Sequence, residues 1–176
     1  MSTIKWVIDP THSEIGFKVK HMMFTNVSGK FQNFNASIET NGDDFENAQI
    51  EFSGDINSVT TGNADRDGHL LSPDFFDAEQ FPKITFEATS FKKIDEGDFT
   101  LTGNLSLHGV TKAITLETEF SGLMQDPWGN TKAGLSLTGK INRKDWNLSW
   151  NSALETGGVL VGEEVKLAID LQFIKQ

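Results

Sequence analysis

Apolar and polar residues alternate along most of this sequence, and that alternation restricts the possible folds more than any other feature. Ile15, Phe17 and Val19 alternate with glycine and lysine. The longest run, over 165–173, places Val, Leu, Ile, Leu and Phe at every second position. A period of two is typical of β-strands that bury one face and expose the other. The chain is therefore predicted to be all-β.

The alternating runs and the turn signals between them predict about eight or nine strands. Asn41-Gly42, Glu96-Gly97 and His108-Gly109 are such turn signals. The short gaps imply antiparallel pairing, and so many strands must close into a barrel or fold into a sandwich to protect their edges. Since no linker, internal repeat or low-complexity tract interrupts the pattern, residues 1–176 are expected to form a single domain.

The segment 62–82 breaks the alternation. Its Leu70, Leu71, Phe75 and Phe76 are spaced for short helical turns. The Ser72-Pro73-Asp74 sequence is typical of a helix start, with a capping serine, a proline at the first position and an acid in the first turn. A short helical crossing segment is therefore predicted near 62–81, between two strands.

The charged residues of this segment have a structural interpretation that we favour over a catalytic one. Asp65 and Asp67 are expected to pair with Arg66 or to cap backbone groups. Asp74 is expected to complement the positive end of a helix.

Composition excludes several classes of function. The chain carries a net charge of −10, which counts against binding nucleic acid through phosphates and against docking on an anionic membrane. It contains no cysteine, so disulfides, zinc–thiolate sites and thiol catalysis are excluded. No apolar run suggests a signal peptide or stable membrane insertion. We expect a cytoplasmic protein as given, and a periplasmic one if a leader was removed.

The sequence offers little support for catalysis or for a metal. The four histidines are His12, His21, His69 and His108. No two of them have the i, i+4 spacing of helical zinc motifs. Asp9, His12 and Ser13 lie close together, but a turn leading into a strand explains them better than a catalytic triad does. The chain has no nucleophile elbow and no glycine-rich nucleotide loop. No enzyme, metal or cofactor is therefore predicted.

Several stretches, in order along the chain, match one known family. They are WVIDPTHSEIGFKVKH at 6–21, VSGKF at 27–31, RDGHLLSPDFFD at 66–77, FPKITF at 81–86, LTGNLSLHGVTK at 101–112, DPWGN at 126–130, NRKDW at 142–146 and VGEEVKLAIDLQF at 161–173. With these motifs the chain resembles the YceI-like proteins, a bacterial family with a lipocalin-like antiparallel barrel. It departs from many relatives at Asn147, where they have glycine. The conformation of the turn at 146–148 is therefore not predicted.

The resemblance implies an eight-stranded or slightly larger lipocalin-like barrel whose elongated apolar pore takes polyisoprenoids or similar long-chain amphiphiles. It also implies no established catalytic residues and a homodimer. From the strand pattern, the residues predicted to line the lumen are Phe17, Val19, Phe31, Phe34, Ile38, Ile50, Phe52, Phe86, Leu105, Leu135 and Ile169. The residues predicted at the mouth, as headgroup contacts or as a gate, are His21, Arg66, His69, Phe75 and Phe76.

Three functions remain open at this point. The first is binding, storage or transport of a long-chain lipid such as a polyisoprenoid, a prenyl quinone or a fatty-acid-like molecule. The second is a structural or interaction module whose barrel is packed shut. The third is an enzyme on a hydrophobic substrate, with His21 or His69 as general base.

Overall fold

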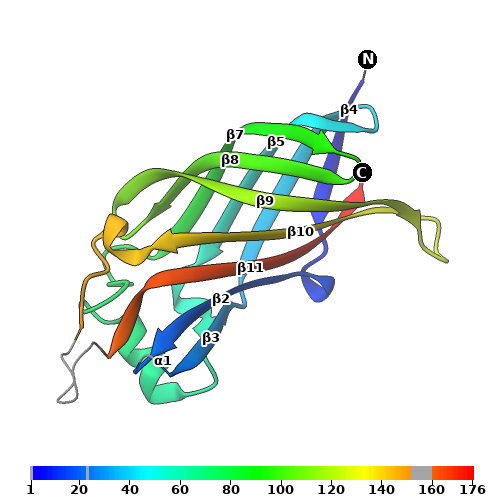
Figure 1. Cartoon of the computed structure of the whole chain (residues 1–176). Helices are drawn as coiled ribbons and strands as arrows, with labels where there is room; N and C mark the ends of the chain where they lie inside the picture. Colours follow the sequence, from blue (N-terminus) through cyan, green and yellow to red (C-terminus); the bar gives the residue numbers. More distant parts are fainter. Residues whose placement is uncertain (1, 23, 152–159) are drawn as a thin grey trace.

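The computed structural model describes residues 2–22, 24–151 and 160–176, and most of these residues lie in β-strands (Figure 1). Eleven strands form one antiparallel sheet within the described residues. They are β1 (Thr3–Ile8), β2 (Glu14–His21), β3 (Thr25–Phe31), β4 (Phe34–Asn41), β5 (Asp44–Asp55), β6 (Val59–Thr60), β7 (Lys83–Asp95), β8 (Asp98–Leu107), β9 (Val110–Gln125), β10 (Thr131–Asn142) and β11 (Val161–Lys175).

Eight of these strands close into a barrel. Their order is β1-β4-β5-β7-β8-β9-β10-β11, and β11 pairs back onto β1. Closure leaves no free edge in this ring. The predicted antiparallel eight-stranded barrel is thus confirmed.

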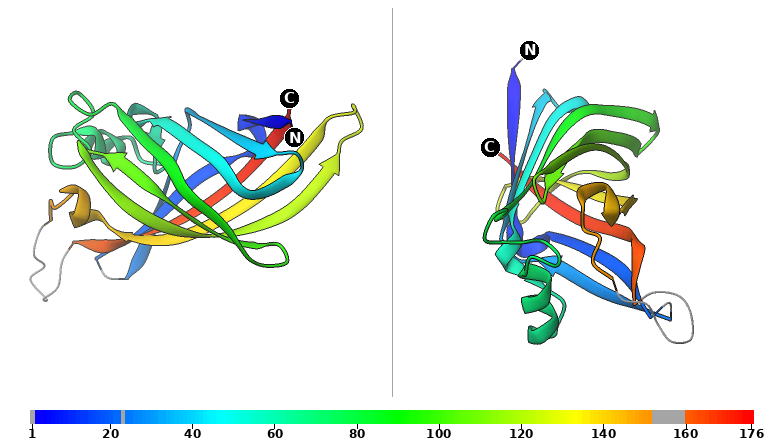
Figure 2. Two further views of the ribbon diagram at one scale, coloured as in Figure 1. Left: turned by 90° about the horizontal axis from the view of Figure 1, so that it is seen from above. Right: turned by 90° about the vertical axis from the view of Figure 1, so that its left-hand side faces the viewer.

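Strand β11 is long enough to pair with two strands along the same edge. Residues 173–175 pair with β1, and residues 161–170 pair with β2. A short 3-10 helix, η1 (Pro10–His12), separates β1 from β2. Beyond β2, the strands β3 and β6 extend the sheet past the closed ring. The three added strands lengthen the barrel wall at one end (Figure 2).

The two ends of the barrel differ. At one end lie both chain termini (Figure 1), and aromatic rings fill the interior there. The Trp6 and Phe45 ring centroids are 5.1 Å apart, and those of Phe45 and Phe120 are 4.6 Å apart. Phe91 and Phe99 stack beside them at 4.6 Å. We call this the closed end, and the opposite end, beside the helix α1, the mouth.

The crossing segment lies where the sequence predicted it, but its helix is placed differently. Helix α1 (Ala64–Leu71) begins after Asn63, whose side chain accepts a hydrogen bond from the Arg66 backbone N–H. Ser72 ends the helix, because its backbone N–H and its hydroxyl both donate to the His69 carbonyl. The prediction that Ser72 begins the helix was therefore wrong: Asn63 is the N-cap.

Two further 3-10 helices flank the barrel, η2 (Ile56–Ser58) and η3 (Arg143–Trp146). Helix η3 ends at Asn147, in the turn whose conformation the sequence did not predict. Asn147 has φ 60° and ψ 22°. Asparagine is among the few residues that adopt this left-handed conformation readily. Asn147 therefore keeps the turn without glycine. Within the described part of the chain, no helix has the length and apolar character needed to cross a membrane.

Candidate functional site

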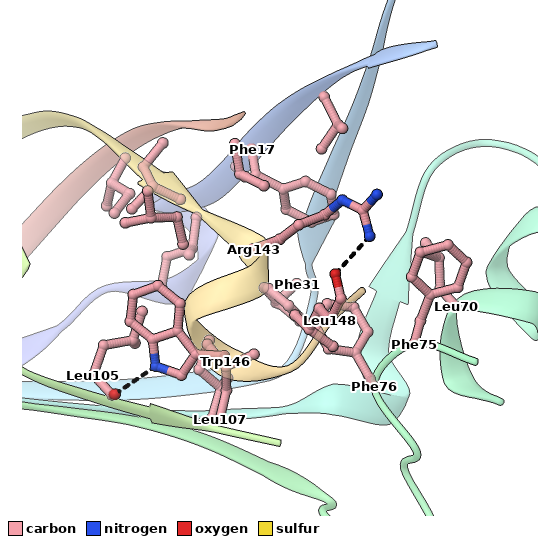
Figure 3. Close-up of a pocket in the computed structure, with 18 of the residues that line it drawn as sticks. Phe17, Phe31, Leu70, Phe75, Phe76, Leu105, Leu107, Arg143, Trp146 and Leu148 are labelled. Carbon is pink, nitrogen blue, oxygen red and sulfur yellow. Dashed lines mark hydrogen bonds between the residues drawn. The ribbon is translucent and has the colours of Figure 1, made fainter. Parts of the chain in front are cut away.

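The barrel holds a cavity of about 510 Å³ whose lining includes residues of α1 and η3 at the mouth. Figure 3 shows part of this lining. The cavity volume falls in the range of about 300–1,000 Å³ that is typical of small-molecule sites. Aliphatic and aromatic side chains from β2, β3, β5, β7, β8, β9, β10 and β11 form most of the wall. Its charged or titratable lining residues are Lys20, His21, Asp65, Arg66, His69 and Arg143.

Strand alternation explains why this wall is apolar. On β2, the side chains of Phe17 and Val19 face the cavity, whereas Lys18 between them is exposed. The structure brings nine of the predicted lumen residues to the cavity: Phe17, Val19, Phe31, Ile50, Phe52, Phe86, Leu105, Leu135 and Ile169. All five predicted mouth residues also line it: His21, Arg66, His69, Phe75 and Phe76. Their contact with a ligand stays a prediction.

Phe34 and Ile38 were predicted to line the lumen, but neither is part of the cavity wall. Ile38 is 0% exposed and pairs with Trp6 across β1 and β4, at the level of the aromatic rings that fill the closed end. Phe34 packs against the core cluster that includes Ile56 and Val59, next to the crossing segment. Both side chains share the inward face of β4, but each lies at a depth where other side chains fill the barrel.

On one side of the mouth, α1 is tied to the loop before it by two charged side chains. Arg66 donates from Nε to the Thr61 hydroxyl at 2.8 Å and from Nη2 to the Thr61 carbonyl at 2.9 Å. Asp67 accepts from the Thr61 backbone N–H at 2.8 Å and from its hydroxyl at 2.6 Å. The sequence predicted that Asp67 would either pair with Arg66 or cap a backbone group, and Asp67 caps the Thr61 backbone N–H. Arg66 binds Thr61 and not an acid.

His69, on α1, belongs to a small aromatic cluster at the same rim. Its ring lies edge-on to Phe75 at 5.0 Å and to Trp150 at 4.8 Å. Its Nε2 is 2.8 Å from Asp74 Oδ2. The predicted role of Asp74 at a helix start was therefore wrong, because this carboxylate follows α1 and pairs with the imidazole. The cluster joins α1 to the segment after η3.

On the other side of the mouth, Arg143 is 4% exposed and holds two segments together (Figure 3). Its guanidinium donates to the carbonyls of Leu148 at 2.5 Å, Trp150 at 2.9 Å and Gly162 at 2.8 Å. Burial lowers the pKa of Arg143, and the nearby Glu163 carboxylate opposes that shift. Arginine stays protonated in proteins, so a buried positive charge faces the cavity.

Trp146 fixes η3 against the barrel wall. Its indole N–H donates to the Leu105 carbonyl at 3.0 Å, and its side chain is 2% exposed. His108, at the β8–β9 turn, lies with Nδ1 2.9 Å from the Trp146 carbonyl. These contacts place both Trp146 and the next turn over the cavity, and they give His108 a structural role.

Four further residues line the cavity but were not predicted from the sequence: Arg143, Trp146, Leu148 and Trp150. These residues lie in and after η3, where no alternation indicates a face. The NRKDW motif at 142–146 was the available signal, because it pairs a charged and a large aromatic residue within one turn.

The Asp9, His12 and Ser13 group forms a turn, as favoured from the sequence. Asp9 accepts hydrogen bonds from the Thr11 backbone and hydroxyl and lies 2.8 Å from His12 Nδ1. The hydrogen bond with His12 lowers the pKa of Asp9 to about 2. Ser13 exchanges hydrogen bonds with the Gln172 backbone instead of with His12. None of the three residues lines the cavity.

The chemistry that this site offers is burial of an apolar molecule with polar contacts at one end. The wall is hydrocarbon, and the charged lining residues belong to β2, α1 and η3 near the mouth. Among the described residues, no three His, Cys, Asp or Glu side chains are grouped closely enough to hold a metal ion.

Comparison with known proteins agrees with this architecture. A UPF0312 protein of Staphylococcus aureus strain N315 is 36% identical over 169 residues, which cover 96% of each chain. The YceI protein of Campylobacter jejuni has a crystal structure with a TM-score of 0.76, 32% identity and coverage of 89% of this chain and 90% of that one. BcnA of Burkholderia cenocepacia superposes with a TM-score of 0.79 at 19% identity, over 94% of this chain and 98% of that one.

A polyisoprenoid-binding domain of Saccharophagus degradans, implicated in plant cell wall breakdown, shares the fold with a TM-score of 0.69 at 17% identity, over 97% of this chain and 98% of that one. The model of the YceI-like domain matches residues 6–173. With a family match over nearly the whole chain and a relative of 36% identity, this protein belongs to the YceI-like family.

Proposed function

We propose that this protein binds a long-chain apolar amphiphile in the barrel, and that it stores or transports that molecule without changing it. Candidate ligands are a polyisoprenoid, a prenyl quinone or a fatty-acid-like lipid. The observation that carries the proposal is the cavity of about 510 Å³, whose wall is apolar except at the mouth. The polyisoprenoid-binding domain of S. degradans has the same fold and indicates which ligand class to test first.

The free energy of burial is large enough for tight binding without many polar contacts. Each CH₂ group moved from water into an apolar site contributes about 0.8 kcal/mol. For a chain of about 20–40 carbons, the sum is about 16–32 kcal/mol. All but the shortest of these chains thus reach or exceed the affinity ceiling of about 18–21 kcal/mol for non-covalent complexes. Much of it is offset by the lost freedom of a flexible chain. The depth of the cavity above the closed end would then set which chain lengths fit.

Arg66 is our first candidate for a headgroup contact. Its Nε and Nη2 groups bind Thr61, while no described residue accepts a hydrogen bond from its Nη1 group. His69 and His21 line the same rim. These three side chains offer donors to a quinone carbonyl, a carboxylate or a phosphate.

Native mass spectrometry of the protein purified from cells, followed by lipid extraction, tests the proposal. We expect a bound mass in the lipid range, and uptake of a prenyl quinone by emptied protein. Trp146 and Trp150 line the cavity, so quenching of tryptophan fluorescence reports the uptake. A protein that carries no lipid and takes up no prenyl quinone overturns the proposal.

A matched pair of variants locates the ligand. Leu137 faces the cavity and its neighbour Thr138 is exposed on the outside of β10. Leu137→Trp is expected to block uptake, whereas Thr138→Trp adds the same side chain outside and is expected to leave uptake unchanged. If Leu137→Trp unfolds, Ile141→Trp nearer the mouth replaces it. Equal uptake by the inward and outward variants places the ligand elsewhere and contradicts the proposal.

The same experiments separate the two alternatives. A barrel packed shut would leave no space, and the cavity argues against it. An enzyme would release a changed molecule, so a ligand recovered with its original mass after incubation supports binding alone. The homodimer implied by the family resemblance stays a prediction.

A further inference from the structure

Three lysines stand in one row across the outside of the barrel. In the strand register, Lys140 of β10 lies opposite Lys166 of β11, and Lys166 lies opposite Lys18 of β2. All three side chains are exposed. Like charges directly opposite each other in a sheet are destabilising. The row therefore opposes folding stability, which points to a use for its charge.

None of these three lysines lies within ion-pair distance of a carboxylate on any described residue. Other lysines of this chain are paired: Lys144 lies 2.7 Å from Glu163, and Lys175 lies 3.5 Å from Asp43. In a protein with a net charge of −10, three adjacent lysines without an ion pair to a described carboxylate form a local exception.

Charge of the opposite sign lies farther along the same strands. Four residues toward the closed end, Asp170 of β11 lies opposite Glu14 of β2 and Ser136 of β10, and Ser136 lies opposite Glu119 of β9. Four residues of strand span about 13 Å. This outer face is thus basic at the lysine row and acidic farther toward the closed end. Two carboxylates lie nearer the row: Glu117, opposite Thr138, and Glu164, two residues from Lys166.

The adjoining β2–β3 hairpin is basic and has an apolar tip. Residues 15–30 contain Lys18, Lys20 and Lys30 and no carboxylate. Phe24, at the turn, is 82% exposed, and Met22 is also exposed. Exposed apolar and basic side chains thus lie together on this hairpin. Lys20 and His21 line the cavity, so the tip adjoins the mouth.

The rim also carries acids, and most of them are already bound. Asp67 is held by Thr61, Asp74 by His69 and Glu163 by Lys144. Asp65, Asp145 and Glu164 remain as acids without an ion pair to a described residue. Glu164 lies on the outer face of β11 opposite Asn142. Near the mouth, the three lysines of the row and Lys20 thus outnumber these three acids.

We propose that the lysine row and the Phe24 tip form a surface that docks on an anionic phospholipid bilayer, with the cavity mouth turned toward the lipid. The lysines would meet phosphate and carboxylate headgroups, and Phe24 would enter the interface. At physiological salt, charges are screened over about 8 Å, so the carboxylates about 13 Å away oppose this contact weakly. Glu117 and Glu164, two residues from the row at about 7 Å, oppose it more, and the three lysines outnumber them. The net charge of the chain, which counted against an anionic membrane, is therefore a poor guide to this face.

Docking goes beyond the proposed binding function and does not need it. A vesicle without prenyl lipid tests the surface alone, and uptake of prenyl quinone from detergent tests the cavity alone. If both hold, the protein exchanges its ligand directly with a bilayer. If the protein binds vesicles but takes up no prenyl quinone, the binding proposal fails and docking stands. If it takes up prenyl quinone but binds no vesicles, docking fails and the binding proposal stands.

Co-sedimentation with phosphatidylcholine vesicles, with and without phosphatidylglycerol, measures the docking. We expect binding only with phosphatidylglycerol present, and a decrease as salt is added. The triple variant Lys18→Gln, Lys140→Gln, Lys166→Gln is expected to lose about tenfold or more in partition coefficient. Phe24→Ser is expected to lose about tenfold. Thermal melting checks folding, and the triple variant should melt no lower than the parent, because it removes a repulsion.

The matched control is Lys5→Gln, Lys93→Gln, Lys175→Gln. These lysines are paired with Glu39, Glu96 and Asp43, respectively, and the triple change alters the net charge equally. We expect this control to bind vesicles at least half as well as the parent. Equal loss in both triple variants, or no binding to anionic vesicles, overturns the proposal. A row variant that binds like the parent also overturns it, and assigns the lysines to another acidic partner such as a protein.

Discussion

The ring of Phe17 lies directly over the backbone of Gly29 on the neighbouring strand. The two residues are register partners in β2 and β3, and a Cβ added to Gly29 would lie 2.4 Å from Phe17 Cζ. That distance is far below van der Waals contact. The absence of a side chain at position 29 therefore sets how far the Phe17 ring stands back from the cavity that it lines.

The substitution Gly29→Ala is expected to push the Phe17 ring into the cavity and to weaken lipid uptake. A shift that removes space for one or two CH₂ groups lowers affinity by about 1–2 kcal/mol, or about tenfold. Titration of tryptophan fluorescence with a prenyl quinone measures the change. The companion variant Phe17→Leu, Gly29→Ala relieves the clash and should recover uptake. Unchanged affinity in Gly29→Ala would show that Phe17 does not limit the cavity.

The substitution Gly68→Ala is expected to stabilise the protein. Gly68 lies inside α1, and an added Cβ there meets no atom within 4 Å. Glycine in a helix interior costs about 0.5–1 kcal/mol relative to alanine. Urea unfolding should show a gain of this size if α1 unfolds with the barrel. A gain in protease resistance of 64–71 without a change in the global midpoint would instead show that α1 opens separately.

The substitution Arg143→Met is expected to loosen the mouth. It retains an apolar side chain of similar length but leaves the carbonyls of Leu148, Trp150 and Gly162 without their donor. A buried polar group without a partner costs about 1–3 kcal/mol, so we expect a destabilisation of at least about 2 kcal/mol. Hydrogen exchange should rise at 148–150 more than in the distant strand β4. A uniform rise across the barrel would contradict a local role.

The face of each strand was predictable from sequence, whereas the depth of each residue along the barrel was not. Ile38 and Ile50 are register partners on the same inward face, and period-two alternation selects both. Only Ile50 reaches the cavity. Ile38 lies at the level of Trp6 and the other aromatic rings of the closed end, which come from strands far apart in sequence. No local sequence pattern indicates how far along the barrel axis a residue lies.

The mouth was predictable only in part, because its residues do not alternate. The crossing segment stood out by its broken period, which led to Arg66, His69, Phe75 and Phe76. On the opposite rim, Arg143 acts through backbone carbonyls of two segments that meet only in the folded barrel. A guanidinium that binds carbonyls needs no acidic residue at a fixed spacing. Its role therefore leaves no charge pattern in the sequence.

The last prediction concerns the pH dependence that Asp9 gives to stability. Hydrogen bonding to His12 lowers the pKa of this carboxyl from 3.8 to about 2 in the folded protein. A lowered carboxyl pKa stabilises the fold above the unfolded-state value, and the contribution is lost as pH falls toward the folded-state value. Asp9→Asn should therefore cost at most about 2 kcal/mol at pH 7, and the cost should shrink between about pH 4 and pH 2. Urea midpoints of both proteins across this range measure it, since other carboxylates titrate equally in each. A difference between the two proteins that stays constant down to pH 2 would show that Asp9 acts through packing instead of charge.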